Sequence, residues 1–200
     1  MQARPTIRRV GLALAVLPIL LLIAAPSTRA QDSSEYLIKA GFMYNFANLV
    51  QWPAASFPQA DTPITIAILG QDHFGPVLDR VLEGKKVNGR SFVIKRLRSI
   101  SELQRLAGNP KDCQILYVSS SEIAHEADAL QIVRGTPILT IGEIPGFARS
   151  GGIINLVLED NKVRFEVNVD AAKQADLSIS SRLLALARIV QTTADGRKPE

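Results

Sequence analysis

Residues 64–69 read Ile-Thr-Ile-Ala-Ile-Leu, a short apolar run that Gly70 closes, and it predicts a strand. Similar runs follow along the chain, and they alternate with amphipathic stretches that predict helices. The further predicted strands are Ser91–Leu97, Ile115–Val118 and Ile138–Ile141, and the predicted helices are Phe74–Leu82, Ser99–Ala107 and Ser119–Val133. This βαβα order predicts a largely parallel sheet with helices on both faces.

The C-terminal part of the sequence departs from that order. Ile153–Leu158 and Val163–Val169 flank Asp160-Asn161, a dipeptide typical of a type I′ hairpin turn. In the second strand the apolar residues alternate with Arg164, Glu166 and Asn168, which predicts one buried face and one polar face. A closing helix is expected at about Ser180–Val190. We therefore predict a single α/β domain with a mixed, mostly parallel sheet in Rossmann-like layers, a C-terminal β-hairpin and a closing helix.

A helix is also predicted before the sheet, at Tyr36–Val50, after the capping residues Ser33-Ser34. Gln51-Trp52-Pro53 ends it, because a residue that precedes proline is disfavoured in helical conformation. Apolar side chains surround much of this helix, so it should be covered on two sides or lie at an interface. We therefore expect the protein to form a homodimer.

The N-terminus has the pattern of a secretory signal. Met1–Arg9 carries three arginines and no acidic residue, and Val10–Ile23 is then an apolar run interrupted only by Pro18. The alternative, an uncleaved membrane anchor, needs about 20 apolar residues, and this run is shorter. We predict a signal peptide at residues 1–30 with cleavage near Ala30, an exported domain at 31–192, and a polar tail at 193–200.

The net charge of the whole chain is +4, from 23 basic and 19 acidic residues. Cleavage near Ala30 removes four arginines and no acidic residue, which leaves 19 of each sign. The predicted mature domain is therefore neutral and has no basic cluster with interleaved aromatic residues. These features exclude nucleic acid as an expected partner.

Cys113 is the only cysteine, so no disulfide can form within the chain. Its place just before the apolar run Ile115–Val118 is typical of a small buried hydrophobic residue. A redox role, as a reactive thiol or in an intermolecular disulfide, is the alternative interpretation. No His or Lys stands beside it in sequence to lower the pKa of its thiol.

The usual catalytic motifs are incomplete. The loop at Gly70–Gly75 lacks the third spaced glycine of a dinucleotide fingerprint and the Lys-Ser/Thr pair of a phosphate-binding loop. A receiver-like phosphoacceptor would need acids after two strands, and only Asp72 is in place. His73 and His125 are the only histidines, and neither belongs to a hydrolase motif or a zinc spacing. We expect no cofactor, no metal and no catalysis.

Several sequence blocks lie in one order over about residues 35–190. They are Lys39–Phe46 with Trp52-Pro53, Val87–Arg90, Cys113–Ser119, Ile138–Ile141, Phe147, Gly151–Leu156, Phe165–Asn168 and Leu177–Ala187. Together these blocks resemble the YfiR-like family of exported proteins. The resemblance implies a periplasmic α/β domain that dimerises and represses a membrane-bound diguanylate cyclase by binding its periplasmic sensor region, which lowers cyclic-di-GMP and restrains biofilm formation. Some members carry further cysteines in disulfides, so redox control of that kind is not expected with Cys113 alone.

The sequence leaves two hypotheses for the binding role. The first is the cyclase regulator, and the alternative is a small-ligand-binding sensor for another membrane signalling protein. The polar row on the last long strand supports the second hypothesis, although Arg164 and Glu166 could simply pair in solvent. Trp52 is either an interface anchor or a core residue. The candidate partner- or ligand-binding residues are Phe42, Tyr44, Trp52, Arg90, Arg164, Glu166 and Asn168.

Overall fold

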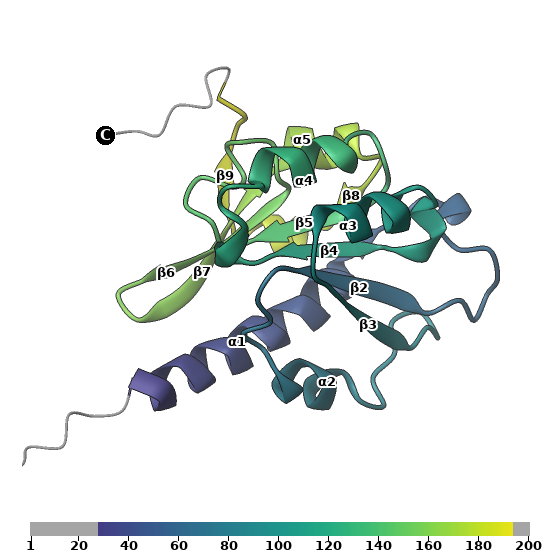
Figure 1. The fold of residues 1–200 in the computed structure, drawn as a ribbon. Coiled ribbons are helices and arrows are strands. Elements are labelled where there is room, and N and C mark those ends of the chain that lie inside the picture. The colour runs from purple at the N-terminus through teal and green to yellow at the C-terminus, as the bar shows by residue number, and fades with distance from the viewer. Residues whose placement is uncertain (1–27, 194–200) are drawn as a thin grey trace, which may run out of the picture.

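The computed structural model describes residues 28–193 (Figure 1). The predicted signal peptide and polar tail lie almost wholly outside the described residues. Within residues 28–193, no helix combines the length and the apolar character that crossing a membrane requires.

The centre of the molecule is a seven-stranded sheet with the strand order β3-β2-β4-β5-β6-β7-β9. The strands are β2 (Ile64–Leu69), β3 (Phe92–Leu97), β4 (Ile115–Val118), β5 (Leu139–Gly142), β6 (Ile154–Glu159), β7 (Lys162–Asn168) and β9 (Arg188–Val190). Every neighbouring pair is parallel except β6 and β7, which form the antiparallel hairpin. The mixed, mostly parallel sheet predicted from the sequence is therefore confirmed.

Helices lie on both faces of the sheet (Figure 1). On one face, α1 (Thr28–Leu49) and α2 (Pro76–Leu82) share a hydrophobic core with Ile66 and Ile68 of β2. On the other, α3 (Ile100–Ala107) and α4 (Glu126–Ile132) share a second core with Ala67 and Leu69. Since side chains alternate along a strand, one apolar run supplies both cores.

Shorter elements complete the chain. They are α5 (Val169–Gln174), α6 (Ser181–Leu184), the 3-10 turns η1 (Ala54–Ser56), η2 (Pro110–Asp112) and η3 (Ser120–Glu122), and a two-stranded antiparallel sheet of β1 (Val50–Gln51) and β8 (Ser178–Ile179). The predicted helix at Ser119–Val133 is thus divided into η3 and α4. Ser119 does cap a turn, but its hydroxyl accepts from the Ser121 N–H, which tightens that turn to a 3-10 helix.

Helix α1 is longer than predicted and is covered unevenly. It begins at Thr28, so the proposed capping residues lie inside it. Ala40, Met43, Phe46 and Ala47 are fully buried against the sheet, while the side chains one turn earlier are open to solvent. The exposed residues are Leu37 (54%) and Ile38 (48%). One side of α1 is therefore core, and the other presents apolar groups at the surface.

The prediction of a closing helix at Ser180–Val190 is correct for the first turn and wrong for the rest. Helix α6 ends at Leu184, and the chain then extends into β9, whose residues pair in parallel with Glu166–Asn168 of β7. An unpaired β7 edge would leave backbone N–H and C=O groups open. Pairing with that edge outweighs the helical periodicity of the local sequence.

The hairpin turn is of the predicted type, because Asp160 and Asn161 both have positive φ, 49° and 58°. The predicted polar face of β7, in contrast, is only partly open. Arg164 is exposed, but Glu166 is 6% exposed and Asn168 is fully buried. The strand β9 and the segment around Ala148 cover that end of β7.

Asn168 connects three parts of the chain. Its side-chain oxygen accepts from the Ala171 N–H and caps α5, while its amide donates to Ala148 O at 2.7 Å and to Thr192 Oγ1 at 2.8 Å. We expect Asn168→Ala to lower the free energy of unfolding by about 2 kcal/mol, because it removes a cap and leaves a buried carbonyl unpaired. Urea unfolding measures the change. Ser180→Ala, which removes the exposed cap of α6, is the control and should cost less; equal losses would contradict the assignment.

Candidate binding site

The order of the strands in the sheet changes direction between β2 and β4. From β2 the chain passes to β3 on one side, and then returns past β2 to β4 on the other side. Open α/β sheets bind ligands outside the carboxyl ends of their strands at such a change of direction. The residues that follow β2, β4 and β5 are therefore the first place to look for a site.

The loops after β2 and β4 fit closely against each other. The Gln71 N–H donates to Ser121 Oγ at 2.9 Å. A Cβ atom on Gly70 would lie 2.5 Å from both Ser121 Oγ and Glu122 Cγ, and Gly70 has a φ of +89°. Only glycine satisfies both constraints, so the close contact between the two loops explains the glycine at position 70.

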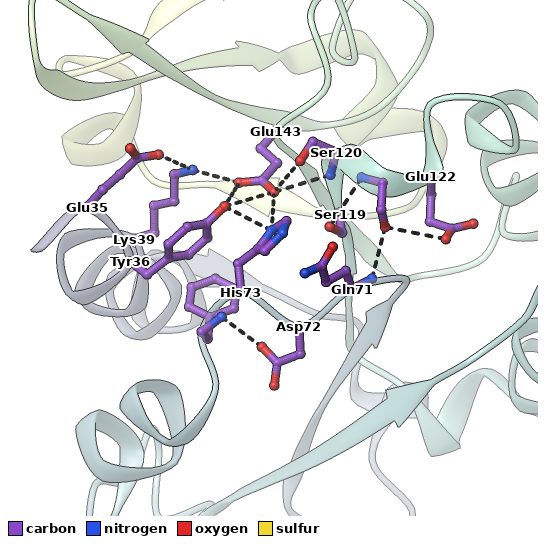
Figure 2. Close-up of polar contacts among 12 residues, drawn as sticks. Glu35, Tyr36, Lys39, Gln71, Asp72, His73, Ser119, Ser120, Glu122 and Glu143 are labelled. Atoms are coloured by element: carbon purple, nitrogen blue, oxygen red, sulfur yellow. Dashed lines mark hydrogen bonds and ion pairs between the residues drawn. The ribbon is translucent and has the colours of Figure 1, made fainter. Parts of the chain in front are cut away.

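Beside this contact, polar side chains converge on Glu143, which follows β5 directly (Figure 2). Lys39 Nζ of α1 lies 2.6 Å from Oε2, and the Tyr36 hydroxyl lies 3.0 Å from the same oxygen. Ser120, after β4, donates to Oε1 from its backbone N–H at 3.2 Å and from its hydroxyl at 3.0 Å. We call Glu35, Tyr36, Lys39, His73, Tyr117, Ser120 and Glu143 the Glu143 cluster.

Glu35 and His73 complete the ring around this carboxylate. Lys39 Nζ also lies 2.5 Å from Glu35 Oε1, so the ammonium bridges two carboxylates. His73 Nδ1 is 3.1 Å from the Tyr36 hydroxyl and 3.4 Å from Glu143 Oε1. With a proton on Nδ1, His73 donates to the Tyr36 hydroxyl and to Glu143 Oε1, while the Tyr36 hydroxyl donates to Glu143. The Nδ1-protonated tautomer of His73 therefore fits these hydrogen bonds.

The Glu143 carboxylate is held ionised although its side chain is only 4% exposed. Burial opposes its ionisation, but the ammonium of Lys39 and the donated hydrogen bonds outweigh burial and lower the pKa of Glu143 to about 2. Lys39 is itself 4% exposed. The two side chains form a buried ion pair that connects α1 to the carboxyl end of β5.

Tyr117 contributes a buried hydroxyl next to Glu143. Its side chain is 1% exposed, and the hydroxyl interacts with the Glu143 carboxylate but makes no hydrogen bond of normal geometry with a described residue. Burial raises the pKa of Tyr117, and the negative charge of Glu143 raises it further. The phenol is therefore a neutral donor directed toward the cluster.

Two of the predicted binding residues, Trp52 and Arg90, lie together away from this cluster. Both contact Phe57: the indole edge-to-face, and the guanidinium stacked 3.9 Å from the ring centroid. Trp52 Nε1 donates to Gln114 O, and Arg90 donates to Gln59 O and Thr62 O. These contacts fix the loop between β1 and β2, while Tyr44 lies apart, against Phe92 and beneath Lys85 Nζ.

Phe42 and Arg164 meet in a second place, an open groove of about 410 Å³ between α1, β7 and β9. We call this the α1–β7 groove, and it is lined by Phe42, Val157, Val163, Arg164, Phe165, Leu186, Ala187 and Arg188. Leu186 is 75% exposed. Arg164 pairs with Glu159 at 3.5 Å rather than with Glu166, which instead lies near Arg149 and Arg188. The groove is lined by apolar side chains and by Arg164 and Arg188, both of which pair with Glu159.

Cys113 is fully buried, and its thiol donates to Ile115 O. Burial raises the pKa of the thiol to about 12, so the structure favours the interpretation as a small buried hydrophobic residue. We expect a thiol reagent such as Ellman's reagent to label the native protein at least about a hundredfold more slowly than the urea-unfolded protein, because labelling requires opening. Equal rates would contradict this burial.

Sequence reasoning missed the Glu143 cluster. Ser120 and Glu143 each follow a strand that was predicted nearly to the residue, so the rule for carboxyl ends of parallel strands could have selected them. Lys39, within an apolar segment of α1, was a second signal. Tyr36 lies 37 residues from His73 and 107 residues from Glu143 in the sequence, so no local pattern predicts that these side chains meet. Among the described residues, no group of three acidic, histidine or cysteine side chains could hold a metal ion.

These features define a class: an α/β domain with a mixed sheet, a cluster of polar side chains at the carboxyl ends of its parallel strands, and a separate groove between α1 and β7. A family model described as YfiR/HmsC-like matches residues 36–188. The chain belongs to this family, and membership supports a role as a periplasmic regulator. Comparison with curated proteins gives no match.

Three solved structures are similar to this chain at low sequence identity. A conserved domain protein from Vibrio cholerae aligns with a TM-score of 0.52 and 10% identity, over 77% of this chain and 59% of that one. Two others have TM-scores of 0.48 and 0.45 with 9% and 16% identity: an ABC domain from Streptococcus pneumonia in complex with L-Trp, covering 64% of this chain, and a ligand-free, open substrate binding protein with adhesive properties from Clostridium difficile, covering 67%. This chain spans 55 to 59% of the three matched chains, and the similarity concerns the fold alone.

Proposed function

We propose that this protein is a non-catalytic periplasmic regulator that binds and represses the periplasmic sensor region of an inner-membrane diguanylate cyclase, and so lowers cyclic-di-GMP. Family membership supports the regulatory role. The observation that carries the proposal is the α1–β7 groove, where apolar side chains that include the exposed Leu186 lie beside polar groups. Exposed apolar patches with a polar rim mark protein interaction sites.

The groove has the composition of an interaction surface. Phe42 lines the groove and stacks on Phe46, so a partner would contact an aromatic ring held by its neighbour. Leu186 stands at one wall, 75% exposed, and Ile38 lies one helical turn before Phe42. Arg164 and Arg188 at the rim would favour an acidic border on the partner.

We expect Leu186→Glu to abolish repression without loss of fold, because it places a charge on the exposed wall of the groove. Cellular cyclic-di-GMP in this variant should rise to the level of a deletion strain. Ile123→Glu is the matched control, since Ile123 is 51% exposed but lies outside the groove, and it should repress like the wild type. A deletion strain with unchanged cyclic-di-GMP, or a Leu186→Glu protein that represses fully, would refute the proposal.

The proposal includes processing and assembly. Cleavage near Ala30 would leave nearly all of α1 in the periplasmic domain at 31–192, and N-terminal sequencing of the exported protein tests it. The exposed Leu37 and Ile38 support a homodimer that uses α1. A monomeric mass by light scattering at high concentration would contradict the homodimer.

The second candidate function, a small-ligand-binding sensor for another membrane protein, is favoured by the Glu143 cluster rather than by the polar row on β7. Asn168 and Glu166 of that row are buried and engaged within the domain. A thermal-shift screen against periplasmic metabolites tests the sensor hypothesis. A ligand at 100 times its Kd should add about 2.7 kcal/mol to the free energy of unfolding, and a screen without any stabilising compound would refute it.

A further inference from the structure

Every group that contacts the Glu143 carboxylate is a hydrogen-bond donor. The ammonium of Lys39, the hydroxyl of Tyr36, and the N–H and hydroxyl of Ser120 all donate to its two oxygens. A shell that contains an ammonium, a backbone N–H and hydroxyls is one that proteins use to bind carboxylate and phosphate groups. Here a side chain of the protein itself occupies the shell.

The donors come from separate parts of the chain and meet where this sheet geometry places ligands. Lys39 and Tyr36 project from α1, Ser120 follows β4, and His73 lies in the loop after β2 (Figure 2). The carboxyl ends of β2 and β4 flank the change of direction in the sheet. An ion pair needed only to connect α1 to β5 would not require Ser120 and His73 as well.

Glu143 does not satisfy every donor around it with good geometry. The Tyr117 hydroxyl is buried next to Glu143 and interacts with its carboxylate, but it makes no hydrogen bond of normal geometry with a described residue. Buried hydroxyls are rarely left unpaired, so such a group needs an explanation. A ligand with more acceptor oxygens than a glutamate side chain would supply its partner.

We infer that the Glu143 cluster is a binding site for the oxyanion group of a small molecule, a carboxylate or a phosphate, which the Glu143 side chain occupies until the ligand displaces it. The exchange conserves charge, since one anion enters beside Lys39 as another leaves. It requires rotation of one side chain at the end of β5. The site stands independently of the proposed repression of a cyclase.

Two probes test the inference: inorganic phosphate and acetate, titrated onto the exported protein with sodium chloride at equal ionic strength as reference. Calorimetry gives the Kd, and the thermal midpoint reports stabilisation. Glu143→Ala removes the internal occupant, Glu143→Ala with Lys39→Met also removes the main cation, and Glu122→Ala is a control that removes a neighbouring carboxylate outside the cluster, paired with His125.

We expect Glu143→Ala to bind one of the two probes saturably, and the wild type to bind the same probe at least about tenfold more weakly, because its own carboxylate competes at high effective concentration. Glu122→Ala should behave like the wild type, and the double variant should lose binding. If phosphate binds more tightly than acetate, an additional phosphate oxygen is the expected hydrogen-bond partner of Tyr117. If acetate binds more tightly, the ligand belongs to the carboxylate class.

The inference is overturned if Glu143→Ala responds to neither probe beyond the chloride reference. It is also overturned if the wild type binds neither, since Glu143 is then a fixed structural group. If Glu143→Ala does not fold, the wild-type titration decides alone, with Ser120→Ala as the variant that removes a single donor hydroxyl and should weaken binding. Repression of the cyclase is measured separately, so failure of the site and failure of the proposed function are distinguishable.

Discussion

Replacing Lys39 with methionine is expected to lower the free energy of unfolding by about 3 to 5 kcal/mol, because it leaves the buried Glu143 carboxylate without its counterion. Methionine keeps the length of the side chain, so the loss reports charge rather than packing. The pKa of Glu143 should rise in this variant, since the burial that opposes its ionisation is no longer outweighed by the ammonium. Urea unfolding at neutral pH measures the change in free energy.

Lys173→Met is the matched control for this experiment. Lys173 is also a helical lysine near a carboxylate, with Nζ 3.9 Å from Asp170, but its side chain is 73% exposed. Exposed pairs of this kind contribute less than about 1 kcal/mol. If the two methionine variants lost equal stability, the Lys39–Glu143 pair would not be the buried contact described above. Adding Glu143→Gln to Lys39→Met should recover part of the loss.

The second large effect is an acid transition. The pKa of Glu143 is about 2 in the folded protein, below its ordinary value of about 4.3 in an unfolded chain. The ionised carboxylate therefore stabilises the fold fully above the unfolded pKa, and this contribution disappears as the pH falls toward 2. The stability lost between about pH 5 and 2 amounts to about 3 kcal/mol for this group.

Glu143→Gln isolates that contribution. This variant should be less stable than the wild type at neutral pH, but its stability should fall less steeply between pH 5 and 2. Urea unfolding at a series of pH values, with the difference between the two proteins as the readout, makes the comparison. Parallel curves for the two proteins would show that Glu143 does not titrate as described.

The parts of the fold that follow from local pattern were predictable. Ile64–Leu69 and Ile115–Val118 match β2 and β4 to the residue, because continuous apolar runs bounded by turn residues leave few alternatives. The end of the chain was not predictable in this way. Residues 185–190 have helical periodicity, and the last three of them form β9 because the edge of β7 offers a partner, which no local window of sequence contains.

The same distinction applies to the candidate sites. Phe42 and Arg164 were chosen for their residue types, and the structure brings them together in one groove. Glu166 and Asn168 are candidates because they alternate with apolar residues on a predicted strand. That alternation does not show that β9 and the segment at Ala148 cover both side chains. The Glu143 cluster depends on contacts between distant segments, so its donors became visible only once the sheet order was known.

Helix α1 is held by two different kinds of contact along its length. From Ala40 to Leu49 it is anchored by a hydrophobic core, whereas residues 34–39 are attached through the Lys39 and Tyr36 side chains and expose Leu37 and Ile38. Apolar burial extends over many contacts, but a polar attachment depends on a few atoms. Amide hydrogen exchange should therefore divide the helix: the first turns open by local fluctuation, and the later turns exchange only when the whole domain unfolds.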